Sequence, residues 1–199
     1  AREALERAET AFGLEHPETG QRLNRLALLC LQMGRPKEAV PMYKRALEIS
    51  IDPIAANNLG VLYFDTGRFN EAKDVYLAVI NIKPESLEAH NNLGLAYDRL
   101  GRSKEAELEY RTAIKIDFDY VLAHINLGIL YKSKGLLEQA ITEFKLVLYH
   151  EPGRPEIHRL LGEVYSGVGL TAEAEAEFRE VQRLLCLGKA ADKDSNCAR

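Results

Sequence analysis

The sequence lacks the features that define several large classes of protein. Three cysteines in 199 residues, Cys30, Cys186 and Cys197, are too few and too scattered for a disulfide framework or a zinc site. No run of about 18 apolar residues occurs, so we predict no membrane insertion. The net charge of −4 provides no basic field for a phosphate backbone, which argues against a nucleic-acid partner. No signal peptide is visible, so we expect a cytoplasmic, reducing location, with an upstream targeting segment as the open alternative.

Repetition is the dominant feature of the sequence. A glycine recurs every 34 residues, at Gly60, Gly94, Gly128 and Gly162. Within each copy, apolar residues at helical spacing precede and follow a second glycine, which predicts two amphipathic helices joined by a turn. A period in this range is typical of a stacked solenoid. The other positions that recur in phase are Gly67, Gly101, Gly135 and Gly169; Tyr63, Tyr97, Tyr131 and Tyr165; Ala72, Ala106, Ala140 and Ala174; and Tyr76, Tyr110, Phe144 and Phe178.

The repeats divide nearly the whole chain. We predict one solenoid over residues 1–187 and a disordered polar tail over 188–199. Residues 1–12 have the pattern of a helix end, so the chain opens inside a partial repeat. The first full repeat is predicted to have helices near Gln21–Met33 and Pro36–Ser50. The predicted boundaries are 1–19 for the partial repeat and 20–52, 53–86, 87–120, 121–154 and 155–188 for the full repeats.

These rows resemble the tetratricopeptide repeat family, whose pattern is Leu-Gly, then Tyr, Gly, Ala, Phe or Tyr, Ala and a closing Pro. The resemblance implies an all-α, right-handed superhelical solenoid of antiparallel helix pairs, with about 11 helices in this chain. The first helices of such repeats line a concave groove that binds peptides or protein segments, and the domains are usually adaptors without chemistry of their own. This sequence departs from the family pattern at His90, His124 and His158, which stand in the place of tryptophan, and at Phe118, in the place of the closing proline.

Two branches of the family bear on the function. The first full repeat, with EAVPMYKRALEI over residues 38–49, resembles the kinesin-light-chain-like branch. The chaperone-binding branch clamps a C-terminal carboxylate with Lys, Asn and Arg on the groove face. No corresponding position carries a lysine or arginine here, which disfavours that role; these positions are Ile54, Asn58, Asn92, Leu122 and Asn126.

The resemblance places a second face of each first helix in the groove. Asparagine is a poor helix former, so a row of asparagines inside helices needs a reason. An amide has donors and an acceptor for an extended peptide backbone, and a similar asparagine ladder is a feature of O-linked N-acetylglucosamine transferases. The alternative is that these amides bond neighbouring repeats or water. The predicted groove residues are Asn57, Asn58, Val61, Phe64, Asn91, Asn92, Leu95, Asp98, Ile125, Asn126, Ile129 and Lys132.

An apolar row accompanies the amides at Val61, Leu95 and Ile129. In the groove it would suit a hydrophobic peptide or an amphipathic helix; otherwise these residues pack under the next repeat. Charged residues of the second helices, including Glu109 and Glu177, are predicted to lie on a solvated outer face.

No constellation of residues indicates catalysis, and we expect no enzyme activity, cofactor or metal. The three histidines occur one per repeat, too far apart to share an ion whose bonds are about 2.1 Å long, so we predict packing roles for them. The favoured function is a scaffold that binds a peptide or protein segment. The alternatives are the recognition arm of a larger enzyme, for example a glycosyltransferase, and RNA binding in the manner of pentatricopeptide repeats.

The last helix raises a separate question, because a terminal repeat normally needs a polar cap. Three explanations stay open: a homo-oligomer through this end, a tail that folds back, or a capping element outside the sequence. The exposed apolar residues predicted there are Phe178, Val181, Leu184, Leu185 and Leu187.

Overall fold

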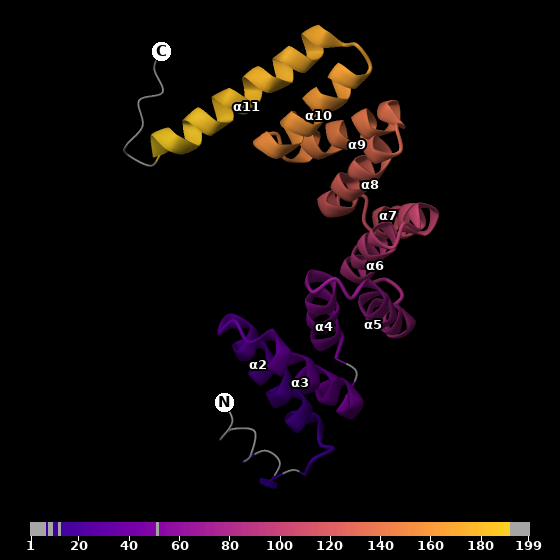
Figure 1. Cartoon of the computed structure of the whole chain (residues 1–199), viewed down its shortest axis with the longest axis vertical. Helices are drawn as coiled ribbons and strands as arrows, with labels where there is room; N and C mark the ends of the chain where they lie inside the picture. The colour runs from indigo at the N-terminus through magenta and orange to yellow at the C-terminus, as the bar shows by residue number, and fades with distance from the viewer. Residues whose placement is uncertain (1–6, 8–9, 12, 51, 192–199) are drawn as a thin grey trace. The chain divides into compact units, whose positions relative to one another are not determined.

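The computed structural model describes residues 7, 10–11, 13–50 and 52–191, and over these residues the chain is helical with no strand. The all-α prediction is confirmed. The predicted leading helix over residues 1–12 lies almost wholly outside the described part. The helices, labelled in Figure 1, are α2 (Pro17–Gln32), α3 (Pro36–Ile49), α4 (Pro53–Asp65), α5 (Phe69–Ile82), α6 (Leu87–Arg99), α7 (Ser103–Ile116), α8 (Val121–Ser133), α9 (Leu137–His150), α10 (Pro155–Gly167) and α11 (Thr171–Ala191).

The chain forms two compact units, residues 1–109 and residues 110–199, and the division falls within α7. In the first unit, α2 packs on α3 and α4 on α5, and the pairs join because α3 contacts α4 and α5 contacts α6. The first helices of successive repeats also meet, since α4 contacts α6. In the second unit, α8 packs on α9, α9 on α10 and α10 on α11. Each unit is therefore built from stacked helix pairs, and a single solenoid over residues 1–187 stays a prediction.

The glycines inside α4, α8 and α10 each make room for an aromatic ring of the second helix. A Cβ atom on Gly128 would lie 2.6 Å from the Phe144 ring, and one on Gly162 would lie 2.7 Å from Phe178. Both distances are shorter than any normal carbon–carbon contact. Glycine costs about 1 kcal/mol relative to alanine inside a helix, and this close packing of the two helices offsets that cost.

The second glycine of each repeat ends the first helix. Gly135 and Gly169 have φ values of 72° and 81°, a left-handed conformation that glycine adopts without the steric penalty of a side chain. The turn predicted between the two helices of a repeat is confirmed at these positions.

Two helix ends differ from the sequence prediction. The helix α2 begins at Pro17, four residues before the predicted start near Gln21, because His16 caps it and a proline suits the first helical position. The last helix α11 continues to Ala191, so the predicted tail does not begin at residue 188. Figure 1 shows α11, in yellow, extending well past its partner α10. Residues 192–199 lie outside the described part.

Candidate peptide-binding surface

Three asparagine amides form a hydrogen-bonded chain across α4 and α6. The Asn92 amide nitrogen donates to the Asn57 oxygen at 2.8 Å, and the Asn91 amide nitrogen donates to the Asn92 oxygen at 3.3 Å. Asn91 is only 4% exposed. In this conformation it supports Asn92 from behind, while Asn57 and Asn92 are half-buried and reach the surface.

The direction of this chain decides what it offers to a ligand. The oxygens of Asn57 and Asn92 are both engaged as acceptors. The Asn57 amide nitrogen has no hydrogen-bond acceptor within the described part of the chain. Asn92 uses one of its two amide N–H groups in the bond to Asn57, and the other N–H group can donate to a ligand. An amide nitrogen carries two donors, so this surface presents N–H donors, which match the carbonyl oxygens of an extended peptide.

Asn58 turns toward the preceding helix pair. Tyr43, on α3, is fully buried, and its hydroxyl has no partner of hydrogen-bond geometry among the described residues. Burial raises the pKa of Tyr43, and the nearby Asn58 amide opposes part of that rise. Asn58 thus lies beside a buried hydroxyl of the preceding helix pair.

Apolar side chains lie along the same helices. Val61 is 40% exposed, and Leu95 is half-buried. Phe64 meets Phe69 edge to face with ring centres 5.3 Å apart, and the Arg99 guanidinium lies 4.9 Å from the Phe64 ring centre. Asp98, also on α6, is half-buried. The predicted residues of the first unit thus lie on α4 and α6 and comprise amides, apolar groups and one carboxylate.

Two openings lie beside the amides at equivalent places in successive repeats. One, of about 350 Å³, is lined by Gln21, Asn24, Arg25, Ser50 and Asp52, among others, and Asn24 donates to Asp52 at 3.1 Å. The other, of about 260 Å³, is lined by residues that include Ile54, Asn57, Lys83, Ser86 and Glu88. Each opening is bounded by a first helix, the end of its second helix and the start of the next first helix. The sequence pattern did not predict either opening.

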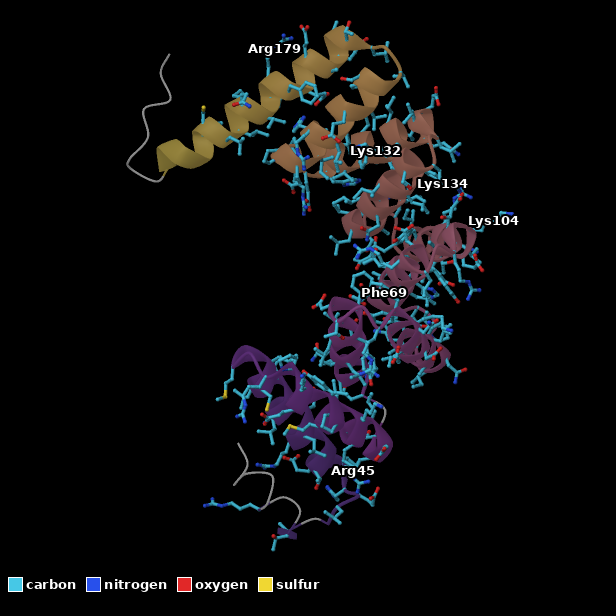
Figure 2. All side chains as sticks on the ribbon, viewed as in Figure 1. Arg45, Phe69, Lys104, Lys132, Lys134 and Arg179 are labelled. Atoms are coloured by element: carbon cyan, nitrogen blue, oxygen red, sulfur yellow. The ribbon has the colours of Figure 1, made fainter. Side chains whose placement is uncertain are left out.

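In the second unit, the corresponding row on α8 is less amide-rich. Ile125 and Asn126 are half-buried, and Ile129 is 41% exposed. Lys132, labelled in Figure 2, forms an ion pair with Glu163 on α10. The hydrogen bond from Lys132 holds the pKa of Glu163 below its usual value. An ion pair therefore joins consecutive first helices here, as an amide pair does in the first unit.

The three histidines each bond two acceptors of their own repeat. In every case Nδ1 lies 2.6 Å from a glutamate of the second helix, and Nε2 lies 2.8–2.9 Å from a backbone carbonyl in the joint that precedes the first helix. These sets, here called the histidine bridges, are His90 with Glu109 and the Pro84 carbonyl; His124 with Glu143 and the Phe118 carbonyl; and His158 with Glu177 and the Pro152 carbonyl.

The bridges correct one prediction. Glu109 and Glu177 do not lie on a solvated outer face, since their side chains are only 17% and 21% exposed and each bonds a histidine. The signal that could have found them is a constant spacing of 19 residues between histidine and glutamate in three copies. At His124, burial lowers the pKa, but the bonds to Glu143 and to the Phe118 carbonyl outweigh it, and the pKa is raised overall.

Over the described residues, no group of three or more His, Cys, Asp or Glu side chains has the arrangement of a metal site. Cys30 is buried, as its place in an apolar row predicts. None of the described helices has the length and apolar character needed to span a membrane.

Comparisons with known proteins agree with the repeats. Models of the tetratricopeptide repeat match residues 1–52, 60–101, 87–120 and 121–152. No curated protein matches the sequence significantly. The structure of MamA is similar with a TM-score of 0.75 and 25% identity, over 83% of this chain and 96% of that one.

Two further solved structures are similar. One is TTC0263, a thermophilic tetratricopeptide repeat protein of Thermus thermophilus, with a TM-score of 0.67 and 25% identity over 83% of this chain and 91% of that one. The other is a tetratricopeptide repeat protein of Parabacteroides merdae, with a TM-score of 0.76 and 22% identity over 97% of this chain and 79% of that one. From its repeats, its helix pairs and these matches, the chain belongs to the tetratricopeptide repeat family.

Proposed function

We propose that this chain is a non-catalytic interaction module that binds an extended segment of a protein partner along its first helices. Membership of the tetratricopeptide repeat family supports the general role of a protein-interaction scaffold. The observation that carries the specific proposal is the oriented amide pair of Asn57 and Asn92 beside the exposed side chain of Val61.

The amide pair binds the ligand through its main chain. Neighbouring helices pack roughly 8–10 Å apart, and an extended strand advances about 3.3 Å per residue, so successive repeats contact about every third residue of the ligand. The N–H groups of Asn57 and Asn92 donate to ligand carbonyls. The 260 Å³ opening lined by Ile54 and Lys83 accepts a ligand side chain next to Asn57.

Apolar contacts supply the rest of the affinity. Each unit by itself has aliphatic groups next to its amides, and these are Val61 and Leu95 in the first unit and Ile125 and Ile129 in the second. Asn126 and Lys132 occupy the polar positions of the second unit. Because neutral amides and apolar groups dominate, we expect binding that changes little with salt concentration.

The test needs a ligand that is defined independently of any cellular partner. Peptides selected from a random displayed library on the 199-residue chain are measured by calorimetry against Asn57→Ala/Asn92→Ala. We expect an affinity about 5- to 150-fold weaker, because two hydrogen bonds of about 0.5–1.5 kcal/mol each are lost.

The matched control is Asn81→Ala, an exposed asparagine on the second helix α5. It should bind like the unmodified chain. The triple variant Asn58→Ala/Asn92→Ala/Asn126→Ala extends the test to partner capture from cell extract, with helical content checked by circular dichroism. Unchanged affinity and capture in both sets of variants would exclude the amide surface as the binding site.

We also propose that the exposed end of α11 associates with a second copy of the chain. Phe178 is 39% exposed, whereas Phe144, one repeat earlier, is 0% exposed, and Leu185 and Leu187 are 47% and 55% exposed. Light scattering should give a mass that rises with concentration in the micromolar range. A constant monomer mass would contradict it.

A further inference from the structure

In all three histidine bridges, the neighbouring oxygens restrict the protonation state of the imidazole ring. In each bridge, both ring nitrogens lie 2.6–2.9 Å from an oxygen. One oxygen belongs to a carboxylate and the other to a peptide carbonyl. An ionised carboxylate and a carbonyl only accept hydrogen bonds, and a neutral imidazole has only one N–H donor. While the carboxylate is ionised, both contacts are satisfied together only when the ring carries two protons and a positive charge.

Each bridge also connects three parts of a repeat. The histidine lies on the first helix, the glutamate on the second helix, and the carbonyl in the joint that comes from the preceding repeat. The carbonyls stand at residues 84, 118 and 152, one repeat apart in sequence, and each precedes its histidine by six residues. The doubly protonated ring therefore connects the joint to both helices of the pair through two hydrogen bonds.

The rings have carboxylates and an aromatic ring as neighbours. Two of these carboxylates also have basic partners, since Asp119 lies 3.5 Å from His150 and Glu180 accepts hydrogen bonds from Arg183. His124 faces Glu143 on α9, Asp119 in the joint and the Phe118 ring, whose centre is 5.5 Å from its own. His158 faces Glu177 on α11, and Glu180 of the same helix interacts with it electrostatically. His90 faces Glu109. Each ring therefore lies beside a carboxylate of the second helix.

One repeat lacks the histidine bridge and fills the same position with apolar residues. In the repeat over residues 53–86, Ala56 stands in the place of the histidine and Val75 in the place of the glutamate. Ala56 is 2% exposed and belongs to an apolar cluster with Val79 and Ala89, against which Val75 packs. The same position is thus filled without any titratable group, and this repeat serves as an internal reference.

We propose that the histidine bridges are a proton-operated latch, in which three charged imidazoles lock the joints at residues 84, 118 and 152 and release them when they lose a proton. The released state is reached as the pH rises. The neutral ring keeps one hydrogen bond and leaves the other acceptor, the carbonyl or the carboxylate, without a donor. Neighbouring repeats stabilise one another, so loss of several bridges loosens more of the stack than the loss of one.

The linkage has a definite sign. A histidine that is protonated in the folded chain and loses its proton more readily when unfolded stabilises the fold at low pH. This stabilisation is complete at pH values below the pKa of the histidine in the unfolded chain, which is 6.5 for an unperturbed histidine. It disappears as the pH rises through the pKa of the histidine in the folded chain. A single such group changes the folding constant by up to about tenfold per pH unit across that interval.

The decisive measurement is the protonation of the rings themselves. In nitrogen-15 spectra of the intact chain at pH 7, we expect the three bridge histidines, assigned by single His→Ala variants, to show two protonated ring nitrogens each. Rings that carry a single proton at pH 7 in the folded chain would overturn the proposal.

A second measurement tests the latch through stability. The comparison uses a bridge-free variant, in which the three histidines become alanine and their three glutamates become valine. Between pH 6 and pH 9, the urea midpoint of the unmodified chain should fall more than that of this variant, and equal falls would contradict the latch. If this variant does not fold, Glu109→Gln/Glu143→Gln/Glu177→Gln provides the same comparison, because it removes the acceptor charge and keeps the shape. The bridge-free variant copies the reference repeat through His90→Ala, His124→Ala, His158→Ala, Glu109→Val, Glu143→Val and Glu177→Val.

Discussion

The helix pairs α4–α5 and α8–α9 share one template but fill the same packing position differently. In α4–α5, Ala56 and Val75 meet in an apolar cluster. In α8–α9, His124 and Glu143 meet, and the histidine also reaches the Phe118 carbonyl. The apolar cluster contains no titratable group and needs no particular hydrogen-bond geometry. The polar bridge needs every hydrogen-bond partner in place, because a buried polar group without a partner costs about 1–3 kcal/mol.

The largest expected effect comes from leaving one bridge half-made. His124→Ala removes the partner of Glu143, whose side chain is only 16% exposed, and we expect a loss of about 3 kcal/mol in the free energy of unfolding. His124→Ala/Glu143→Val copies the solution of α4–α5 and should recover at least half of that loss. Urea unfolding followed by circular dichroism at pH 6 measures both.

The reverse exchange is the control for this prediction. Ala56→His puts an unpartnered ring into the apolar cluster, and Ala56→His/Val75→Glu provides the carboxylate, with the Ser50 carbonyl six residues before position 56. The double variant should be more stable than the single one. If the double variants at both sites are no better than the single ones, the two positions are not equivalent.

A smaller effect is expected where the two pairs are alike. Gly60→Ala and Gly128→Ala each push a Cβ into a buried aromatic ring, of Tyr76 and of Phe144 respectively. We expect each to cost about 1–3 kcal/mol from overpacking, in spite of the better helix propensity of alanine.

Gly162→Ala is the matched case with a ring that can move. A Cβ there meets Phe178, which is 39% exposed at the end of the stack, so its cost in urea unfolding should be the smallest of the three. An equal cost at all three glycines would mean that cover by a further repeat does not decide the penalty.

The next effect depends on pH. The pKa of His124 is raised in the folded chain. The bridge therefore adds stability at pH values below 6.5, the pKa of the unfolded chain, and this contribution disappears as the pH rises through the pKa of the folded chain. Glu143→Gln removes the charged acceptor. The stability difference between this variant and the unmodified chain should be largest below pH 6.5 and shrink toward pH 9 in parallel urea titrations. A difference that stays constant with pH would mean that Glu143 acts through packing alone.

The smallest effect is expected for the contacts between consecutive first helices. Glu163→Gln breaks the ion pair with Lys132, whose partners are 36% and 31% exposed, and should cost no more than about 1 kcal/mol at low salt and less in 1 M NaCl. Asn92→Ala breaks the amide pair with Asn57, and its cost should not change with salt. Urea unfolding at two salt concentrations distinguishes the two, and a salt-dependent cost of Asn92→Ala would contradict the neutral character of that pair.

The sequence was a good guide wherever period and residue size decide the structure. The spacing of 34 residues located the helix pairs and the turn glycines at Gly135 and Gly169. The sequence was a poor guide to polar contacts. Glu109 was assigned to the solvent because a helical wheel describes one helix, while its partner His90 lies on another.

The same limit applies to the candidate surface. Asn57, Asn91 and Asn92 were picked out because asparagine is unfavourable inside helices, and the structure joins them in one hydrogen-bonded chain. That Asn91 is buried while Asn57 is not depends on how α6 sits against α4, which residue types alone do not determine. The partner contacts predicted for these residues stay predictions.

The use of a main-chain carbonyl in each bridge has a consequence for substitutions at the joints. At Phe118, which stands where proline is expected, the bridge forms as it does at Pro84 and Pro152, because the side chain of that residue takes no part in the hydrogen bond. In the first unit, the joint before α6 is tied through its main chain by His90, whereas the described part of the joint before α4 is held through a side chain, since Asp52 accepts a hydrogen bond from Asn24 on α2. A substitution can remove the side-chain contact at Asp52, but no substitution of residue 84 removes the carbonyl that His90 bonds, so the joint before α6 tolerates sequence change that the joint before α4 does not.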